Sequence, residues 1–396
     1  MRSSAASSTF DEMTRSVRPG DHANDLQPPP SQRTNGSVLE GIVERREHGV
    51  IVLSPATGRP FRRVIYTNSY GGEDIFEKIK AGLLPSHHLW GCFELARKGY
   101  EVAIVEPLTD FYLWRNPLPH DLKLLKLVTS WLGKDGIVYC GHNVLYWLPF
   151  LRRLGALQCH IVSLLFAREP LEWSRGHSGI IALNPAAAEQ AHKLAPRAKV
   201  AHLGWGADLR VFPKIPFCPE WFLSCGITHR DHPTLSRAAA RSRNHIRIVA
   251  PARPAGITFP ENVTLVTNGN GQEAVPYPDL LAEEYGRCTA VLIVLKNDPI
   301  QYTGVGTTNL IEAMAMSRPV IVTRTGALPT ELDVEKEGCG LFVPPNDDRA
   351  LAEAIDRIAS DPDAARRMGE RGRALCESHY NIVRYADQLH EFFGTL

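Results

Sequence analysis

Short apolar runs alternate with amphipathic segments along most of the chain. Runs such as 101–105 and 160–164 are rich in Val, Ile and Leu, which is typical of strands buried on both faces of a sheet. Segments such as 119–132 and 185–194 instead place apolar residues at helical spacing. Strands that alternate with helices predict parallel sheets with right-handed crossovers. We therefore expect an α/β protein.

A cluster of prolines divides this alternation into two halves. Residues 212–220 contain three prolines, and proline interrupts the hydrogen bonding of helices and sheets, so this segment is a predicted linker. The expected organisation is two Rossmann-like, doubly wound domains, 39–211 and 221–378, and a C-terminal helix, 379–396, that can cross back to the first domain. Residues 1–38 offer little to bury and are expected to be disordered.

Charge and cysteine usage narrow the class of protein. Of 396 residues, 44 are Lys or Arg and 43 are Asp or Glu, a balance that argues against a nucleic-acid-binding protein. The 8 cysteines have no C-x-x-C spacing and are expected to be reduced thiols. The sequence has no apolar run of about 18 residues and no secretory signal at its start, so we expect a cytoplasmic protein.

The segment after the predicted strand 290–295 has the pattern of a phosphate site. A polar, glycine-containing loop follows the strand and opens the predicted helix 307–317. The first turn of such a helix presents free backbone N–H groups and the positive end of the helix dipole. The residues expected to bind the phosphate there are Gly306, Thr307, Thr308 and Asn309.

A dinucleotide-binding loop is the alternative for this segment. Gly304 and Gly306 nearly fit its G-x-G-x-x-G/A fingerprint, but Asn309 occupies the third position. The next strand also ends in Thr323-Arg324 instead of an acidic residue that could bind ribose, so we reject an NAD site. Glu312, one turn into the helix, can accept hydrogen bonds from two ribose hydroxyls, or it can be an ordinary surface residue.

A second candidate for ligand approach lies in the first half of the chain. The predicted strand 63–67 is followed by Gly71 and Gly72, and a glycine pair after a strand often lets a ligand reach the backbone. An ordinary turn at the end of the strand fits the same residues.

The C-terminal third resembles family 4 (group 1) of the retaining glycosyltransferases, which belong to the GT-B superfamily. Leu310-Ile311-Glu312-Ala313-Met314-Ala315 and the following Pro-Val-Ile are similar to the donor-binding signature of that family. Similar motifs follow at 326–331 and 338–345, and looser ones precede it at 202–212 and 224–231. The first half resembles the family only in outline.

This resemblance implies two Rossmann-like domains that face each other across a cleft. It implies glycosyl transfer from a nucleoside diphosphate sugar to an acceptor hydroxyl with retention, in glycan, polysaccharide or glycolipid synthesis. The expected partners are the donor and a saccharide or lipid-linked acceptor. By resemblance, Arg230 in the loop that begins at Gly226 holds the donor diphosphate and Glu312 holds the ribose. No metal is expected, because the arginine and the helix dipole replace it.

Two departures from the family pattern keep alternatives open. Many members carry a first glutamate eight residues before the second, where this chain has Gly304, and a histidine after the strand 161–165, where it has none. His87, His88 and His160 are candidate substitutes for that histidine. The alternatives are a non-catalytic nucleotide-sugar-binding subunit and another GT-B enzyme, such as a sugar-nucleotide epimerase.

Two segments combine basic residues with apolar ones. Residues 122–127 are leucine- and lysine-rich, and 146–154 contain Trp147, Phe150 and two arginines. We favour core-facing helices with their basic residues in water, and peripheral contact with an anionic membrane surface is the alternative.

Overall fold

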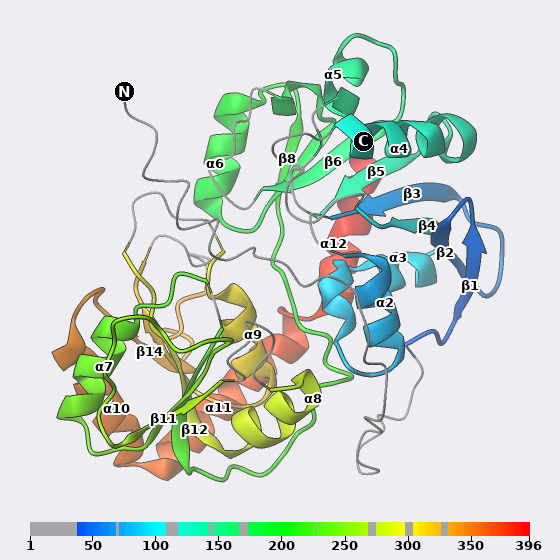
Figure 1. The fold of residues 1–396 in the computed structure, drawn as a ribbon. Coiled ribbons are helices and arrows are strands. Elements are labelled where there is room, and N and C mark those ends of the chain that lie inside the picture. The colour runs from blue at the N-terminus through cyan, green and yellow to red at the C-terminus, as the bar shows by residue number, and fades with distance from the viewer. Residues whose placement is uncertain are drawn as a thin grey trace.

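The computed structural model describes residues 38–68, 71–107, 118–141, 145, 147–165, 173–226, 228–267, 275–297, 304–325 and 332–396. In this part of the chain two sheets, each flanked by helices, form two domains that lie side by side (Figure 1). Two predicted features lie outside the described residues: the disordered tail, except for Val38, and the turn 326–331.

The first domain is built on an eight-stranded sheet in the order β1-β2-β4-β3-β5-β6-β7-β8. Its strands are β1 (Ile42–Glu47), β2 (Val50–Pro55), β3 (Arg62–Thr67), β4 (Tyr100–Val105), β5 (Ile137–Cys140), β6 (His160–Leu165), β7 (Gly179–Ala182) and β8 (Lys199–His202). The strands from β4 to β8 in this order pair in parallel, as predicted, whereas β1 and β2 form an antiparallel hairpin at one edge. We did not predict β1, because its charged sequence is that of an edge strand.

The second domain is built on a six-stranded sheet in the order β11-β10-β9-β12-β13-β14. Its strands are β9 (Trp221–Cys225), β10 (Ile246–Val249), β11 (Val263–Val266), β12 (Cys288–Ile293), β13 (Val320–Thr323) and β14 (Gly340–Val343). All of its pairs are parallel, so their carboxyl ends meet at one edge of the sheet. The predicted α/β class with two Rossmann-like domains is therefore confirmed.

The helices cover the faces of both sheets. The first domain contains α2 (Glu73–Lys80), α3 (Cys92–Arg97), α4 (Leu118–Leu127), α5 (Trp147–Arg153) and α6 (Pro185–Leu194), with 3-10 turns at Ser86–Leu89 and Trp173–Gly176 and a π-helical turn at Val128–Leu132. The second contains α7 (His232–Arg241), α8 (Tyr277–Asp279) with a π-helical turn at Leu280–Tyr285, α9 (Thr307–Ala315), α10 (Asp348–Ala359) and α11 (Pro362–Ser378). The last helix is α12 (Ile382–Thr395).

The amphipathic segment after β14 forms two helices, α10 and α11. The side chain of Asp361 accepts a hydrogen bond from the backbone N–H of Ala364 at 2.8 Å, which caps the start of α11. Pro362 occupies the first helical position, where its missing N–H costs nothing. This cap starts a new helix, so α10 and α11 are separate.

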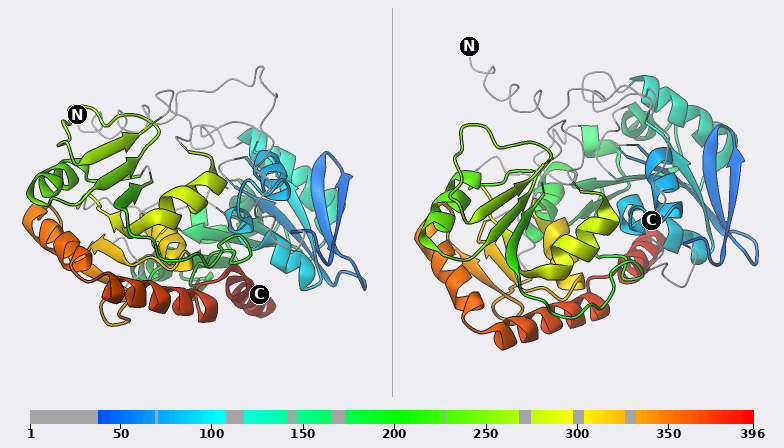
Figure 2. Two further views of the ribbon diagram at one scale, coloured as in Figure 1. Left: turned by 90° about the horizontal axis from the view of Figure 1, so that it is seen from below. Right: turned by 60° about the horizontal axis from the view of Figure 1, so that its bottom comes forward.

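The chain crosses between the domains twice. The segment 203–220 joins β8 to β9, and within it Phe212 is buried and its carbonyl accepts a hydrogen bond from Arg373 Nη1 at 2.8 Å. After α11 the chain returns, and α12 packs on the first domain (Figure 2). There the hydroxyls of Tyr385 and Tyr139 are 2.9 Å apart.

The described residues hold no disulfide and no helix suited to cross a membrane. All eight cysteines are free thiols, and seven of them are buried. None of the described helices is both long enough and apolar enough to span a bilayer.

Candidate functional site

The loop after β9 positions Arg230 at the carboxyl edge of the second sheet. Gly226, which ends the strand, has a backbone φ of +97°, a conformation that favours glycine. Two backbone bonds fix the loop beside the chain that follows β12. Asp231 N–H donates to the carbonyl of Val294, and Lys296 N–H donates to that of His229, each at 2.9 Å.

The guanidinium of Arg230 is buried and holds its own loop together. Nε donates to the carbonyl of Cys225 at 3.1 Å, and Nη1 donates to that of Thr228 at 2.9 Å. Nη2 donates to Oδ1 of Asn309, and burial lowers the pKa of Arg230 from its ordinary value. A guanidinium has five N–H donors, so these three bonds leave two for a ligand.

The first turn of α9 lies beside this arginine. Gly306 caps the helix with a φ of +83°, and Thr307 N–H donates to the carbonyl of Gly304 at 3.1 Å. The hydroxyl oxygen of Thr307 is buried and has no hydrogen-bond partner among the described residues, whereas Thr308 is exposed. A buried hydroxyl without a partner is costly, so its position favours a ligand at this helix terminus.

Asn309 links Arg230 to Glu312, the residue that is predicted to bind the ribose. Its Oδ1 accepts from Arg230, and its Nδ2 donates to the hydroxyl of Tyr285 at 3.2 Å. That hydroxyl in turn donates to Oε2 of Glu312 at 3.2 Å. Arg230, Asn309, Tyr285 and Glu312 therefore form one hydrogen-bonded network. We had predicted only a backbone role for Asn309.

Glu312 is buried, so the interpretation as a surface residue is wrong. Its side chain is 3% exposed, and its Oε1 accepts from the hydroxyl of Tyr277 at 2.5 Å. Burial raises the pKa of Tyr277 and of Tyr285 well above the ordinary value, so both hydroxyls remain donors at neutral pH. The carboxylate therefore accepts two hydroxyl hydrogen bonds, but from tyrosines that the sequence motif did not indicate.

The first domain contributes two histidines to the same site. The 3-10 turn Ser86–Leu89 carries His87, whose Nε2 lies 3.7 Å from Oε1 of Glu312, with both side chains buried. Nδ1 of His87 accepts from the backbone N–H of Asp208 at 3.1 Å, so the ring hydrogen is on Nε2, facing the carboxylate. The rings of His88 and Tyr277 are 6.0 Å apart.

The structure thus separates the three candidate histidines. His87 and His88 lie beside Glu312, whereas His160 lines a pocket at the other edge of the first sheet. The contact between His87 and Glu312 also joins residues 225 positions apart in the sequence, and it lies between the two domains.

The ligand atoms of His87, His88 and Glu312 all lie within 4.8 Å of one another, which is compatible with a metal site. The hydrogen-bond pattern fits a metal poorly. Nε2 of His87 carries a hydrogen and therefore offers no lone pair to a metal.

Gly71 and Gly72 lie at the start of α2, where the carboxylate of Glu106 occupies the position that a bound anion would take. The backbone N–H groups of Gly72 and Glu73 both donate to Oε2 of Glu106 at 2.5 Å. A Cβ on Gly71 would lie 3.0 Å from Oε1 of the same carboxylate. These N–H groups are therefore occupied, and no hydrogen bond between described residues joins the two glycines to the Arg230–Glu312 network.

Buried histidines make the stability of the fold sensitive to acid. Burial lowers the pKa of His88 to about 3 and, together with Lys123, that of His120 to about 4. The unfolded chain takes up these protons below about pH 6.5 and the folded chain does not, so stability is complete above that pH and is lost as the pH falls.

We expect the free energy of unfolding in urea to decrease from pH 7 to pH 4, by up to about 3 kcal/mol from His120 alone. His120→Gln, which can still hydrogen-bond Thr67, should weaken this pH dependence. Parallel curves for the wild type and the variant would contradict the assignment to His120.

Solved structures with the same arrangement identify the fold. The chain superposes on sucrose-phosphate synthase from Thermosynechococcus elongatus with a TM-score of 0.62 and 17% identity, covering 84% of this chain and 99% of that one. It superposes on HepE from Anabaena, solved in complex with UDP, with a TM-score of 0.57 and 14% identity, covering 84% and 100%. The likeness to these two structures shows that the chain has the GT-B fold.

Sequence comparisons match part of the second domain to a protein family. Residues 275–375 match the family Glycosyl transferases group 1, and this region contains the motif around Glu312 that resembles the family. The chain is also 32% identical over 99 residues to alpha-maltose-1-phosphate synthase from Mycolicibacterium smegmatis, covering 24% of this chain and 25% of that protein. The matches span at most about a third of the length of the curated relatives.

Proposed function

We propose that this protein transfers a glycosyl group from a nucleoside diphosphate sugar to an acceptor hydroxyl, with retention at the anomeric carbon. The observation that carries this proposal is the network from Arg230 through Asn309 and Tyr285 to Glu312. In this proposal Arg230, at one end of the network, binds the diphosphate, and Glu312, at the other end, binds the ribose. The HepE structure, which is described as a complex with UDP, has the same fold and supports a nucleotide donor.

In the proposed reaction the bond between the anomeric carbon and the phosphate oxygen breaks, and a bond to the acceptor oxygen forms. The two unused N–H donors of Arg230, the N-terminus of α9 and the Thr307 hydroxyl stabilise the negative charge on the leaving diphosphate. The leaving phosphate takes the proton of the acceptor hydroxyl, so no separate protein base is needed. The carboxylate of Glu312 retains lone pairs for the ribose.

Binding of the donor requires a change at the contact between the domains. Glu312 is 3% exposed and lies against His87, so a ribose can reach the carboxylate only after these side chains separate. A small opening of the two domains provides this access, and reclosure on the bound donor excludes water from the reacting bond.

The remaining parts of the proposal concern acceptor and location. A saccharide or lipid-linked acceptor, within glycan, polysaccharide or glycolipid synthesis, fits the family. The free state of all eight cysteines fits a reducing, cytoplasmic compartment.

The test is to incubate the purified protein with a panel of nucleotide sugars and saccharide acceptors. NMR would follow the release of nucleoside diphosphate and the configuration of the product. Transfer with retained configuration supports the proposal. Binding of a donor without any turnover would instead indicate a non-catalytic subunit, and a free epimerised nucleotide sugar would indicate an epimerase.

We expect removal of divalent metal to leave the reaction unchanged, because Arg230 and the dipole of α9 supply the positive charge. The same assay with and without EDTA checks this expectation, with added Mg²⁺ as the control. A loss of turnover that Mg²⁺ restores would show that a metal is required.

A further inference from the structure

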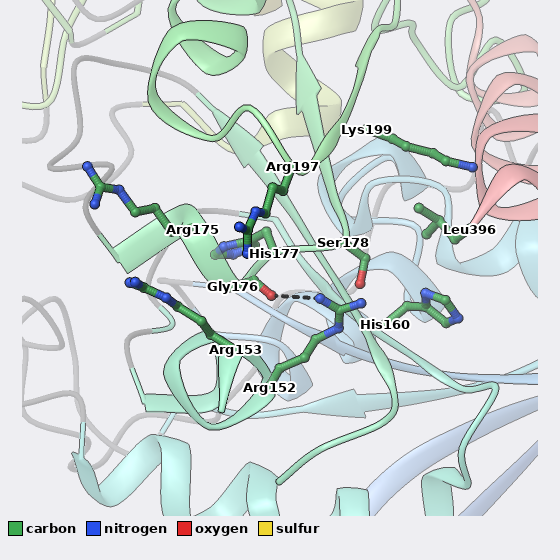
Figure 3. A pocket seen from close by; sticks show the side chains of 10 residues that line it. All are labelled: Arg152, Arg153, His160, Arg175, Gly176, His177, Ser178, Arg197, Lys199 and Leu396. Atoms are coloured by element: carbon green, nitrogen blue, oxygen red, sulfur yellow. Dashed lines mark hydrogen bonds between the residues drawn. The ribbon is translucent and has the colours of Figure 1, made fainter. Parts of the chain in front are cut away.

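A pocket of about 350 Å³ opens at the amino edge of the first sheet, away from the donor site (Figure 3). Its walls include the starts of three neighbouring parallel strands, with His160 at β6, Ser178 just before β7 and Lys199 at β8. The predicted donor residues lie instead at carboxyl strand ends. The lining residues are Arg152, Arg153, His160, Arg175, Gly176, His177, Ser178, Arg197, Lys199 and Leu396.

The charge of this pocket is strongly positive. Five of its ten lining residues are Lys or Arg, two are His, and none has an acidic side chain. Among the described residues, none of these five cations forms an ion pair, and Lys199 donates only to the carbonyl of Thr395. Cations that line one pocket without an acidic partner repel one another, and a bound anion would reduce that repulsion.

The floor of the pocket is fixed by close packing. Arg152 donates from Nε to the carbonyl of Cys159 at 3.0 Å and from Nη1 to that of Gly176 at 3.1 Å. A Cβ on Gly176 would lie 1.7 Å from the carbonyl oxygen of Pro149, so the turn that carries Arg175 lies directly against α5. Arg152 is therefore held in place, while the other four cations are exposed around it.

The helix that supplies two of these arginines also carries exposed apolar side chains. Trp147 is 40% exposed, Phe150 is 37% exposed, and Leu154, one residue past the end of α5, is 64% exposed. The rings of Trp147 and Phe150 lie edge to face with centroids 6.0 Å apart. Apolar and cationic groups side by side are typical of surfaces that meet a membrane interface.

We propose that this pocket binds a phosphate group, presented either by a free phosphorylated ligand or by an anionic lipid headgroup. Four arginines line this one small pocket, and a guanidinium can bind two oxygens of a phosphate at once. The site is separate from the donor site and takes no part in the proposed transfer reaction, so the two proposals can fail independently.

The test compares the wild type with two charge-matched variants of the full chain. Arg175→Gln/Arg197→Gln removes two exposed arginines of the pocket, neither of which hydrogen-bonds to another described residue. The control, Arg243→Gln/Arg253→Gln, removes two exposed arginines of the second domain. Any affinity tag belongs at the N-terminus, because Leu396 lines the pocket. Thermal unfolding checks that both variants are folded.

Two probes distinguish the sources of the phosphate. Inorganic pyrophosphate is titrated by calorimetry with UDP in excess to occupy the proposed donor site, and binding to vesicles of phosphatidylcholine with and without phosphatidylglycerol is measured by sedimentation. The pocket variant should bind at least one probe roughly tenfold more weakly than the control variant does. Weaker pyrophosphate binding indicates a free ligand, and weaker vesicle binding alone indicates a headgroup.

Two results would overturn the proposal. The wild type could bind neither pyrophosphate nor phosphatidylglycerol vesicles, or the pocket variant could match the control variant with both probes. Loss of wild-type binding in 0.5 M salt is expected for a phosphate contact made by exposed arginines, because their field is screened at that ionic strength.

Discussion

Glu312→Gln should lower kcat/KM for the donor about ten- to hundredfold. The substitution replaces a charged acceptor of hydroxyl hydrogen bonds with a neutral one, which costs roughly 1.5–3 kcal/mol, and each 1.4 kcal/mol is a factor of ten. Glutamine is also a good helix former, so α9 should persist. Steady-state kinetics over a range of donor concentrations measure the effect.

The buried position of Glu312 calls for a control that separates stability from binding. Tyr285→Phe removes one of the two hydroxyls that donate to the carboxylate and leaves the charge in place. If Glu312 only supports the tyrosines, Glu312→Gln and Tyr285→Phe should both lower the free energy of unfolding and leave kcat/KM near the wild-type value. Urea unfolding of both variants, run beside the kinetics, distinguishes the two roles.

A donor analogue with 2′,3′-dideoxyribose gives a second test of the same contact. It should bind the wild type poorly and should lose little further affinity with Glu312→Gln, because both changes remove one interaction. Losses that simply add would show that Glu312 does not contact the ribose.

Arg230→Ala should weaken the binding of the free nucleoside diphosphate by about 2–3 kcal/mol, because it removes charge-assisted hydrogen bonds to phosphate oxygens. The structure adds a second consequence. The carbonyls of Cys225 and Thr228 lose their buried donor, so the free energy of unfolding should fall as well. Isothermal calorimetry measures the first effect and urea unfolding the second.

Gly226→Ala tests the role of Arg230 in diphosphate binding without removing the charge of the arginine. A Cβ at this position would lie 2.2 Å from Nη2 of Arg230, so the guanidinium has to move. We expect nucleotide affinity to fall in this variant too, and Arg241→Ala, on the exposed end of α7, to bind as the wild type does. If Arg230→Ala binds the nucleoside diphosphate with unchanged affinity at a temperature where the variant is folded, Arg230 does not bind the diphosphate.

The strands of both sheets were predictable because parallel strands covered on both faces are continuous apolar runs. β12 and β13 are buried along their whole length, and the pattern located both. β1 was not predicted because it is a charged edge strand whose conformation depends on its pairing partner. The local sequence shows an apolar pattern, but it does not show which strand an edge strand pairs with.

The candidate site was predictable only as far as its local motifs extend. The motif around Glu312 indicated a ligand-binding carboxylate, but Tyr277 lies 35 residues away and His87 comes from the other domain. Glu106 is a different case. It follows β4, and β4 is the parallel neighbour of β3, so its carboxylate could have been expected near the glycines that follow β3.

The path of the last helix has a consequence for biosynthesis. α12 completes the core of the first domain, where Leu389 and Phe393 are fully buried, yet the whole second domain lies between β8 and α12 in the sequence. Domains usually fold in the order in which the ribosome makes them. Here the domain made first must wait, with the surface around Tyr139 uncovered, until the second has been synthesised. Residues 221–378, an uninterrupted stretch of chain, can finish folding earlier, although they emerge later.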